Sequence, residues 1–204
     1  PTFNDLFWQS GGNSELDPET SVQAEIGNEL NIGDFNFKLT GYFMDIDDLI
    51  RWIPGNSGIW RPVNTNSVHN YGLEFFSSWS RKIDGNPLSF SANYAFTRSV
   101  DQGTGNQLIY TPKHKLTFSG GYQVEELSFF FQSLYNGSIY TSSDNNYSLD
   151  PYTLVNIGAG YIINKNPETK LNFQVGNLFN ENYQSLPSRI MPGRSFRSSL
   201  TIKF

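Results

Sequence analysis

The chain has 204 residues, a formal net charge of −5 and no cysteine. The acidic balance argues against a nucleic-acid partner, and the lack of cysteine excludes disulfides and thiolate metal sites. Aromatic residues make up 16% of the chain, and their abundance, together with that of Gly, Asn and Ser, favours strands and turns over helices.

Apolar and polar residues alternate along most of the chain, which predicts β-strands with one apolar and one polar face. In chain order, the expected strands span 20–31, 34–46, 66–80, 88–99, 113–124, 127–140, 152–163, 170–180 and 194–204. Phe130 and Leu134 break the alternation, because they are apolar at polar positions. The predicted fold class is all-β and antiparallel, with about nine long strands.

The expected strands have about 10–16 residues, whereas strands of soluble proteins average about 5–6. A strand tilted by about 45° needs about 9–11 residues to cross a bilayer. The lengths therefore favour a transmembrane β-barrel.

The connections between the strands alternate between short and long. The short ones are 31–34, 82–86, 125–126 and 164–169, and the long ones are 47–64, 101–112, 142–150 and 181–193. Antiparallel strands place all the short links at one end and all the long loops at the other, as in outer-membrane barrels. Residues 1–19 are then expected outside with the long loops, and Phe204 at the opposite end. A soluble β-sandwich binding module, such as a lectin-like domain, is the alternative.

Two terminal motifs resemble TonB-dependent outer-membrane receptors. "NLFNENY" at 177–183, followed by "PGRSFRSSLTIKF" at 192–204, resembles the last two strands of that family. "PTFNDLFWQSGGNSELDPETSVQAEIG" at 1–27 resembles its proline-led loop before a strand, and "GYFMDIDDLIRW" and "NYGLEFF" are also similar. The resemblance covers essentially all of residues 1–204 and is nearest to the branch that takes up vitamin B12 (cobalamin).

The resemblance implies a barrel of 22 strands and an N-terminal plug, of which these residues match only the C-terminal barrel part. The chain opens without an initiator Met or a basic leader, so we expect a processed or excised piece. An open sheet of nine strands would leave two unpaired strand edges in lipid, so we expect this chain to be either a fragment of a receptor or one part of an assembly.

The resemblance also implies a function, a location and partners. We expect a bacterial outer-membrane transport receptor that binds a scarce nutrient, cobalamin or a siderophore-like ligand, and imports it with energy from TonB. A siderophore or carbohydrate receptor is the nearest alternative in transport. The expected partners are the nutrient, outer-membrane lipid, the receptor's own plug and TonB. Phe204 resembles the terminal aromatic that the barrel-insertion machinery reads as an assembly signal.

Aromatic residues in the long loops are the candidate ligand contacts. Trp52, Trp60 and Tyr110 lie in or beside these loops, where exposed rings can grip a flat ligand. An aromatic girdle at the membrane interface is the competing interpretation, and we favour it for Tyr140. Pro54, Gly55 and Gly58 would supply turns that bring Trp52 back towards Trp60.

No catalytic site and no cofactor are expected. The chain has two histidines, and both His69 and His114 fall on the apolar face near the outer rim, away from any polar site in the lumen. Asp45, Asp47 and Asp48 lack the spacing and glycine of a calcium loop, as do Asp144 to Asn146, so we interpret them as solvated loop residues.

The polar face of the expected sheet would line the lumen of the barrel. It collects seven charged side chains, Glu25, Glu29, Lys38, Glu74, Lys115, Arg197 and Lys203, as expected of a wetted interior. Gly158, Gly160 and Gly176 also fall there, and both packing of the plug and bending of the sheet would explain their small size.

Overall fold

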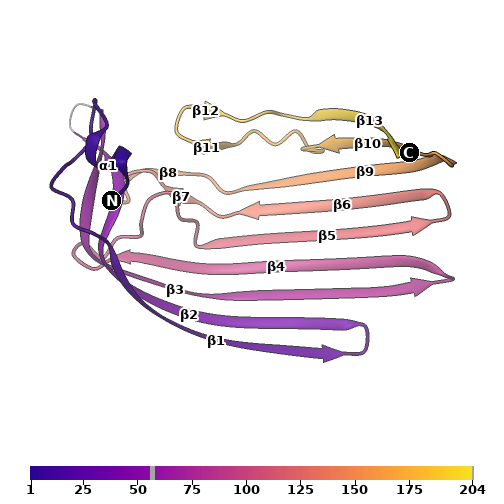
Figure 1. Ribbon diagram of the computed structural model, residues 1–204, viewed down its shortest axis with the longest axis horizontal. Coiled ribbons are helices and arrows are strands. Elements are labelled where there is room, and N and C mark those ends of the chain that lie inside the picture. The colour runs from indigo at the N-terminus through magenta and orange to yellow at the C-terminus, as the bar shows by residue number, and fades with distance from the viewer. Residues whose placement is uncertain (56–57, 204) are drawn as a thin grey trace.

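The computed structural model describes residues 1–55 and 58–203, and its main feature is one antiparallel sheet of nine strands in the order β1-β2-β3-β4-β5-β6-β9-β10-β13 (Figure 1). The strands are β1 (Thr20–Ile32), β2 (Phe35–Pro54), β3 (Trp60–Ile83), β4 (Asn86–Asp101), β5 (His114–Val124), β6 (Leu127–Asn136), β9 (Tyr152–Lys165), β10 (Glu168–Gly176) and β13 (Ser195–Lys203). All nine expected strands are therefore confirmed, although several of their ends differ.

The remaining elements are small. Helix α1 spans Phe3–Phe7, and two further sheets, each of two strands, pair β7 (Ile139–Tyr140) with β8 (Ser148–Leu149) and β11 (Gln184–Leu186) with β12 (Arg189–Ile190). The expected strand at 127–140 is wrong beyond Asn136, because Ile139 and Tyr140 leave the main sheet to pair with β8. Within the described residues, no helix is both long and apolar enough to cross a membrane.

The links at one end of the sheet contract to two residues each, at 33–34, 84–85, 125–126 and 166–167. Asp84 and Gly85 have φ of 51° and 83°, the left-handed pair that a tight type I′ hairpin requires. The opposite end carries the N-terminal segment, the β2–β3 tip and the connections 102–113, 137–151 and 177–194. We call the two ends the short-turn end and the long-loop end, and the predicted sorting of the links is confirmed.

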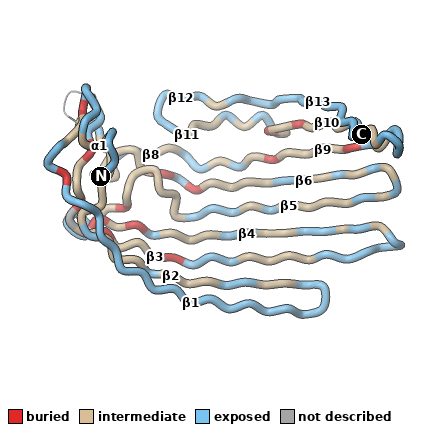
Figure 2. Tube along the Cα trace, in the orientation of Figure 1, coloured by how far each residue is buried: buried red, intermediate tan, exposed pale blue. Residues whose placement is uncertain are grey.

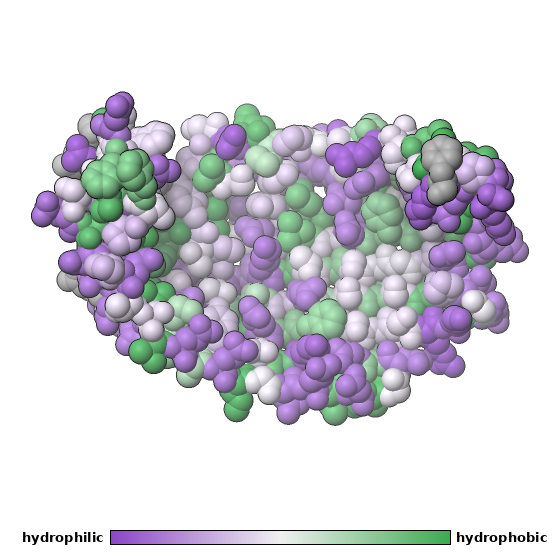
Figure 3. All heavy atoms as spheres, viewed as in Figure 1, coloured by the Kyte–Doolittle hydropathy of each residue, from purple (hydrophilic) through white to green (hydrophobic). Residues whose placement is uncertain are grey.

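Two neighbouring rows of paired residues show how the faces of the sheet differ. One row, read across eight strands, is Phe35, Trp79, Phe90, Gly120, Phe131, Ile157, Val175 and Phe196. The next row, on the other face, is Asn36, Ser78, Ser91, Ser119, Gln132 and Asn156. The face seen in Figure 3 is mostly hydrophilic or weakly polar, which matches the second row.

The main sheet is a single layer, so the soluble β-sandwich is not the observed architecture. Its apolar face is open: Ile26 is 80% exposed and Leu73 is 51% exposed. A continuous apolar surface of this kind marks an interaction with a membrane or a partner. Buried residues gather mainly towards the long-loop end (Figure 2), where Val68 and Pro62 are fully buried.

Candidate ligand-binding site at the long-loop end

Most of the stretch expected as the longest loop is instead a β-hairpin. β2 continues to Pro54 and β3 begins at Trp60, with Trp52 paired to Pro62 and Pro54 paired to Trp60. The expectation of a loop at 48–62 is therefore wrong outside the hairpin tip. The outer parts of β2 and β3 turn away from the direction of the sheet, with α1 beside them (Figure 1).

The N-terminal segment, residues 1–19, is fastened along this hairpin by hydrogen bonds. The indole Nε1 of Trp52 donates to Asp5 Oδ1 at 2.9 Å, and the backbone N–H of Ile50 donates to Glu19 Oε1 at 2.7 Å. Asn64 binds the backbone of Asp17 twice, accepting from its N–H at 2.9 Å and donating to its carbonyl at 3.0 Å. Residues 1–19 thus lie at the long-loop end, as predicted.

Asp5 organises the start of this segment. Its carboxylate accepts hydrogen bonds from both the hydroxyl and the backbone N–H of Thr2, each at 2.7 Å, and so closes the capping box of α1. These bonds, first from the Thr2 side chain, then from its backbone and then from Trp52, lower the pKa of Asp5, because they favour the charged carboxylate.

The structure brings together two of the three predicted aromatic residues. The rings of Trp60 and Tyr110 have centroids 6.3 Å apart, and Trp60 is 40% exposed. Tyr110 has a φ of 58° and its N–H donates to the carbonyl of Tyr140 at 2.9 Å. Partial burial raises the pKa of the Tyr110 phenol, so its hydroxyl stays protonated.

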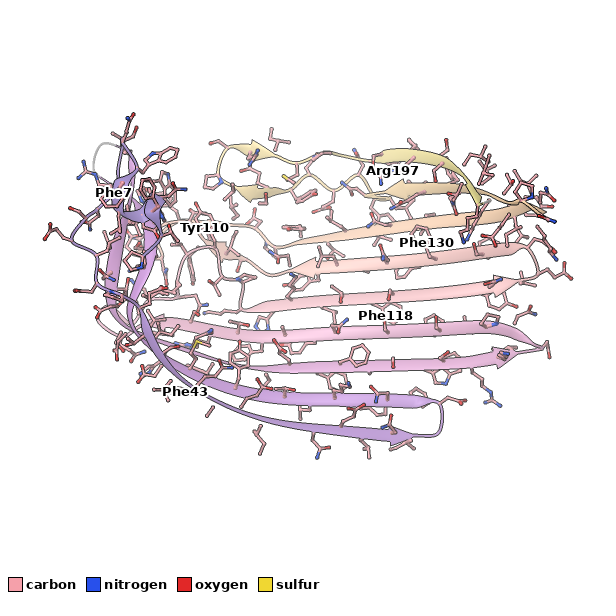
Figure 4. The ribbon with its side chains drawn as sticks, viewed as in Figure 1. Phe7, Phe43, Tyr110, Phe118, Phe130 and Arg197 are labelled. Carbon is pink, nitrogen blue, oxygen red and sulfur yellow. The ribbon has the colours of Figure 1, made fainter. Side chains whose placement is uncertain are left out.

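Trp52 is engaged differently, because its indole Nε1 donates a hydrogen bond to Asp5. Trp52 therefore anchors the N-terminal segment, whereas Trp60 offers ring surface beside Tyr110. Tyr110 and Phe7 both lie at the long-loop end in Figure 4.

Three exposed aromatic residues of the N-terminal segment were missed as candidates. Phe3, Phe7 and Trp8 are 77%, 57% and 55% exposed, and the rings of Phe3 and Phe7 have centroids 5.1 Å apart. Four aromatic or leucine side chains within "FNDLFW" were the available signal, because so many apolar groups in a solvent-facing segment are unusual.

A largely buried ion pair connects a long loop to the hairpin, and one amide side chain connects two of the long loops to each other. Arg51 lies 2.8 Å from Asp101, whose other carboxylate oxygen accepts from the N–H groups of Gly103 and Thr104. Asn145 exchanges two hydrogen bonds of 2.9 Å with the backbone of Gln107. Sequence reasoning missed Arg51 and Asp101, because their positions in the chain do not reveal that they meet.

Residues of the two acidic clusters interact with neighbouring polar side chains. Asp144 accepts from the Ser142 hydroxyl and from Asn146, and these bonds lower its pKa. Asp45 lies 3.4 Å from His69 Nε2. Among the described residues, no group of three or more His, Cys, Asp or Glu side chains is placed to hold a metal ion.

The two histidines lie on the apolar face towards the long-loop end, as predicted. His69 packs against Phe43, with ring centroids 5.4 Å apart, and His114 shares a hydrogen bond of 2.8 Å with the hydroxyl of Tyr94. Each histidine therefore contacts an aromatic side chain, as is common at a membrane–water interface.

Comparison with known proteins decides what kind of sheet this is. The family described as "TonB dependent receptor-like, beta-barrel" matches residues 1–178. The chain belongs to the TonB-dependent receptor family. Proteins of this family are outer-membrane β-barrel receptors, not a class of enzymes.

Two curated relatives of this TonB-dependent receptor chain are vitamin B12 transporters named BtuB. The chain is 31% identical to the one from Photobacterium profundum and 29% identical to one from Vibrio vulnificus. All of this chain is covered in both comparisons, but only 33% of each relative. The receptor chain thus spans about a third of the length of the curated relatives that it matches.

Solved structures of TonB-dependent receptors share the fold. The copper transporter OprC superposes with a TM-score of 0.83 at 17% identity, covering 100% of this chain and 35% of that one. The ferric enterobactin receptor of Pseudomonas aeruginosa superposes with a TM-score of 0.75 at 24% identity, covering 95% of this chain and 32% of that one.

Proposed function

We propose that this chain is the C-terminal barrel portion of an outer-membrane receptor that binds a scarce nutrient outside the cell and imports it with energy supplied through TonB. Membership of the family supports this proposal. The names of the relatives favour cobalamin as the nutrient, and a siderophore-like ligand is the second candidate because a structural neighbour is a ferric enterobactin receptor.

The observation that carries the proposal is the pairing of Trp60 with Tyr110 at the long-loop end. Their rings offer apolar area at small conformational cost, and both are held by backbone that the hairpin and the loop network fix. A flat ligand with apolar edges suits such a surface. The missing receptor domains, the plug among them, would supply the remaining contacts.

Alanine substitutions of the aromatic residues in the intact receptor test this proposal. Trp60→Ala and Tyr110→Ala should each weaken the binding of cobalamin by roughly 1–3 kcal/mol, or about ten- to a hundredfold. Trp52→Phe, which keeps a ring but loses the hydrogen bond to Asp5, should weaken it less, because it acts only through the N-terminal segment.

Trp79→Ala is the matched control, since Trp79 lies on the apolar face far from the long-loop end. Isothermal titration with cobalamin and with a ferric catecholate distinguishes the two ligand classes. If Trp60→Ala and Tyr110→Ala both bind each ligand within about twofold of the wild-type receptor, while the barrel assembles normally, this site does not capture the nutrient.

A further inference from the structure

The apolar face of the sheet is hollowed between β3 and β4. The floor of the hollow is Ser77 and Ala92, which pair directly with each other. Phe37 lies beside Ser77 and Phe118 beside Ala92 in the same row of the sheet. The cavity has a volume of about 480 Å³, and three further rings close it on the short-turn side, those of Phe35, Trp79 and Phe90.

The aromatic walls of this hollow hold one another in place. The rings of Phe35 and Phe37 stack with centroids 5.7 Å apart, and Trp79 stacks on Phe90 at 5.8 Å. Phe90 stacks in turn on Phe118 at 6.0 Å, and Phe118 belongs to the middle of the sheet in Figure 4. Because the walls of the hollow already hold one another in place, binding an occupant requires little ordering of these side chains.

Two opposite charges lie at the short-turn end of the hollow. Arg81 follows Trp79 by two residues on the same face, about 7 Å further along the strand. Its Nε is 3.7 Å from Asp34 Oδ2, and the two side chains are 65% and 45% exposed. An ion pair as long and as exposed as this one leaves both partners able to bind other charged groups.

We propose that the hollow binds one acyl chain of a zwitterionic phospholipid, with the phosphate at Arg81 and the ammonium group at Asp34. The apolar face of an outer-membrane barrel is in contact with the hydrocarbon of the bilayer. A lipid acyl chain can therefore enter the hollow directly from the surrounding membrane. The floor of the hollow lies about 13 Å along β3 from Arg81. The acyl chain can therefore fill the hollow while the head group of the lipid stays at the membrane–water interface. The proposal depends on the family of the chain and not on which nutrient the receptor imports.

The charge pattern selects this occupant over others. Phosphatidylglycerol, an anionic lipid, carries an uncharged glycerol where phosphatidylethanolamine carries its ammonium group. It would therefore satisfy Arg81 but leave Asp34 without a partner of opposite charge. A protein partner would have to fit a hollow floored by two small side chains, whereas a flexible chain fills it without changing the walls.

Fluorescence quenching in bilayers tests the proposal directly. The full receptor is placed in bilayers that contain a small fraction of phosphatidylethanolamine or phosphatidylglycerol with brominated acyl chains, because bromine quenches a nearby indole. Subtracting the fluorescence of the Trp79→Phe receptor from that of the wild-type receptor isolates the emission of Trp79. Brominated phosphatidylethanolamine should quench Trp79 severalfold more than its mole fraction predicts, and brominated phosphatidylglycerol should not.

Variants separate a site from ordinary contact with bulk lipid. Ala92→Leu fills the floor of the hollow, and Arg81→Gln removes the cation that would bind the phosphate. Each variant should reduce the quenching of Trp79 to the level expected from the mole fraction of the brominated lipid. Ala24→Leu makes the same change on the same face beside Phe43, outside the hollow, and should leave the enrichment intact. Arg81→Gln alters only an exposed side chain, so it remains informative if Ala92→Leu does not assemble.

Equal quenching by the two lipids, or a preference for the glycerol lipid, overturns the proposal. Full enrichment in an assembled Ala92→Leu receptor, or in Arg81→Gln, overturns it as well.

Discussion

Arg51 on β2 and Asp101 at the end of β4 form an ion pair with 2.8 Å between Nη2 and Oδ2, and their side chains are only 19% and 10% exposed. Asp101 also accepts from the N–H groups of Gly103 and Thr104. The pair thereby joins the bent hairpin to the loop that carries Tyr110. The geometry of the candidate site rests on this connection.

Arg51→Met should loosen the long-loop end, because it leaves the Asp101 carboxylate buried without its cation. Removing one partner of a buried pair costs about 3–5 kcal/mol. We expect a loss at the lower end of that range, because Arg51 Nε has no hydrogen-bond partner among the described residues. Hydrogen exchange should rise in 48–63 and 102–112, and thermal unfolding should begin at a lower temperature.

Lys203→Met is the control, since Lys203 and Glu168 form an exposed pair at 2.8 Å. Losing a solvent-exposed pair should change the unfolding temperature little, because water screens the attraction between the two charges. If Arg51→Met shifts unfolding no more than Lys203→Met does, the buried pair does not hold the hairpin.

The hydrogen bonds to Asp5 make the attachment of the N-terminal segment depend on pH. Because the pKa of Asp5 is lowered in the folded chain, the charged form supports the folded arrangement. That support is complete above the ordinary aspartate pKa and is lost as the pH falls through the lowered one. Trp52 emission should change in this acid range, and Asp5→Asn should abolish the change. The same acid transition in Asp5→Asn would assign it to another group.

Phe204 lies outside the described residues, and its role as an assembly signal stays a prediction. The described part of β13 ends at Lys203, at the short-turn end. Deleting Phe204 should reduce the abundance of the receptor in the outer membrane of cells, whereas Phe204→Trp, which keeps an aromatic end, should preserve it. Unchanged abundance after the deletion would argue against the role.

The strands, their faces and the sorting of their links were predictable because the information is local. The alternation at 34–46 and the Asp84-Gly85 turn each depend on adjacent residues. The outer hairpin was not predictable in this way. Pro54, Gly55 and Gly58 indicate a loop when taken alone, and only the pairing of Trp52 with Pro62 makes the segment a strand.

Phe130 is part of a packing contact inside the sheet that the sequence alone did not reveal. It breaks the alternation, yet it lies directly opposite Gly158 on β9, and its ring occupies the space that a Cβ at Gly158 would take. The glycine is small because a neighbouring aromatic side chain covers it. The two residues are far apart in sequence, so only the register of β6 against β9 reveals the pair.

Nitroxide labels along residues 35–44 in the full receptor test most directly whether the alternating strands span a membrane with one face in lipid. In bilayers, accessibility to oxygen should alternate, high at 35, 37, 39 and 43 and low at 36, 38, 40 and 42, because the apolar face meets hydrocarbon, in which oxygen concentrates. A flat profile, or one with the opposite phase, would show that the apolar face of β2 does not meet lipid.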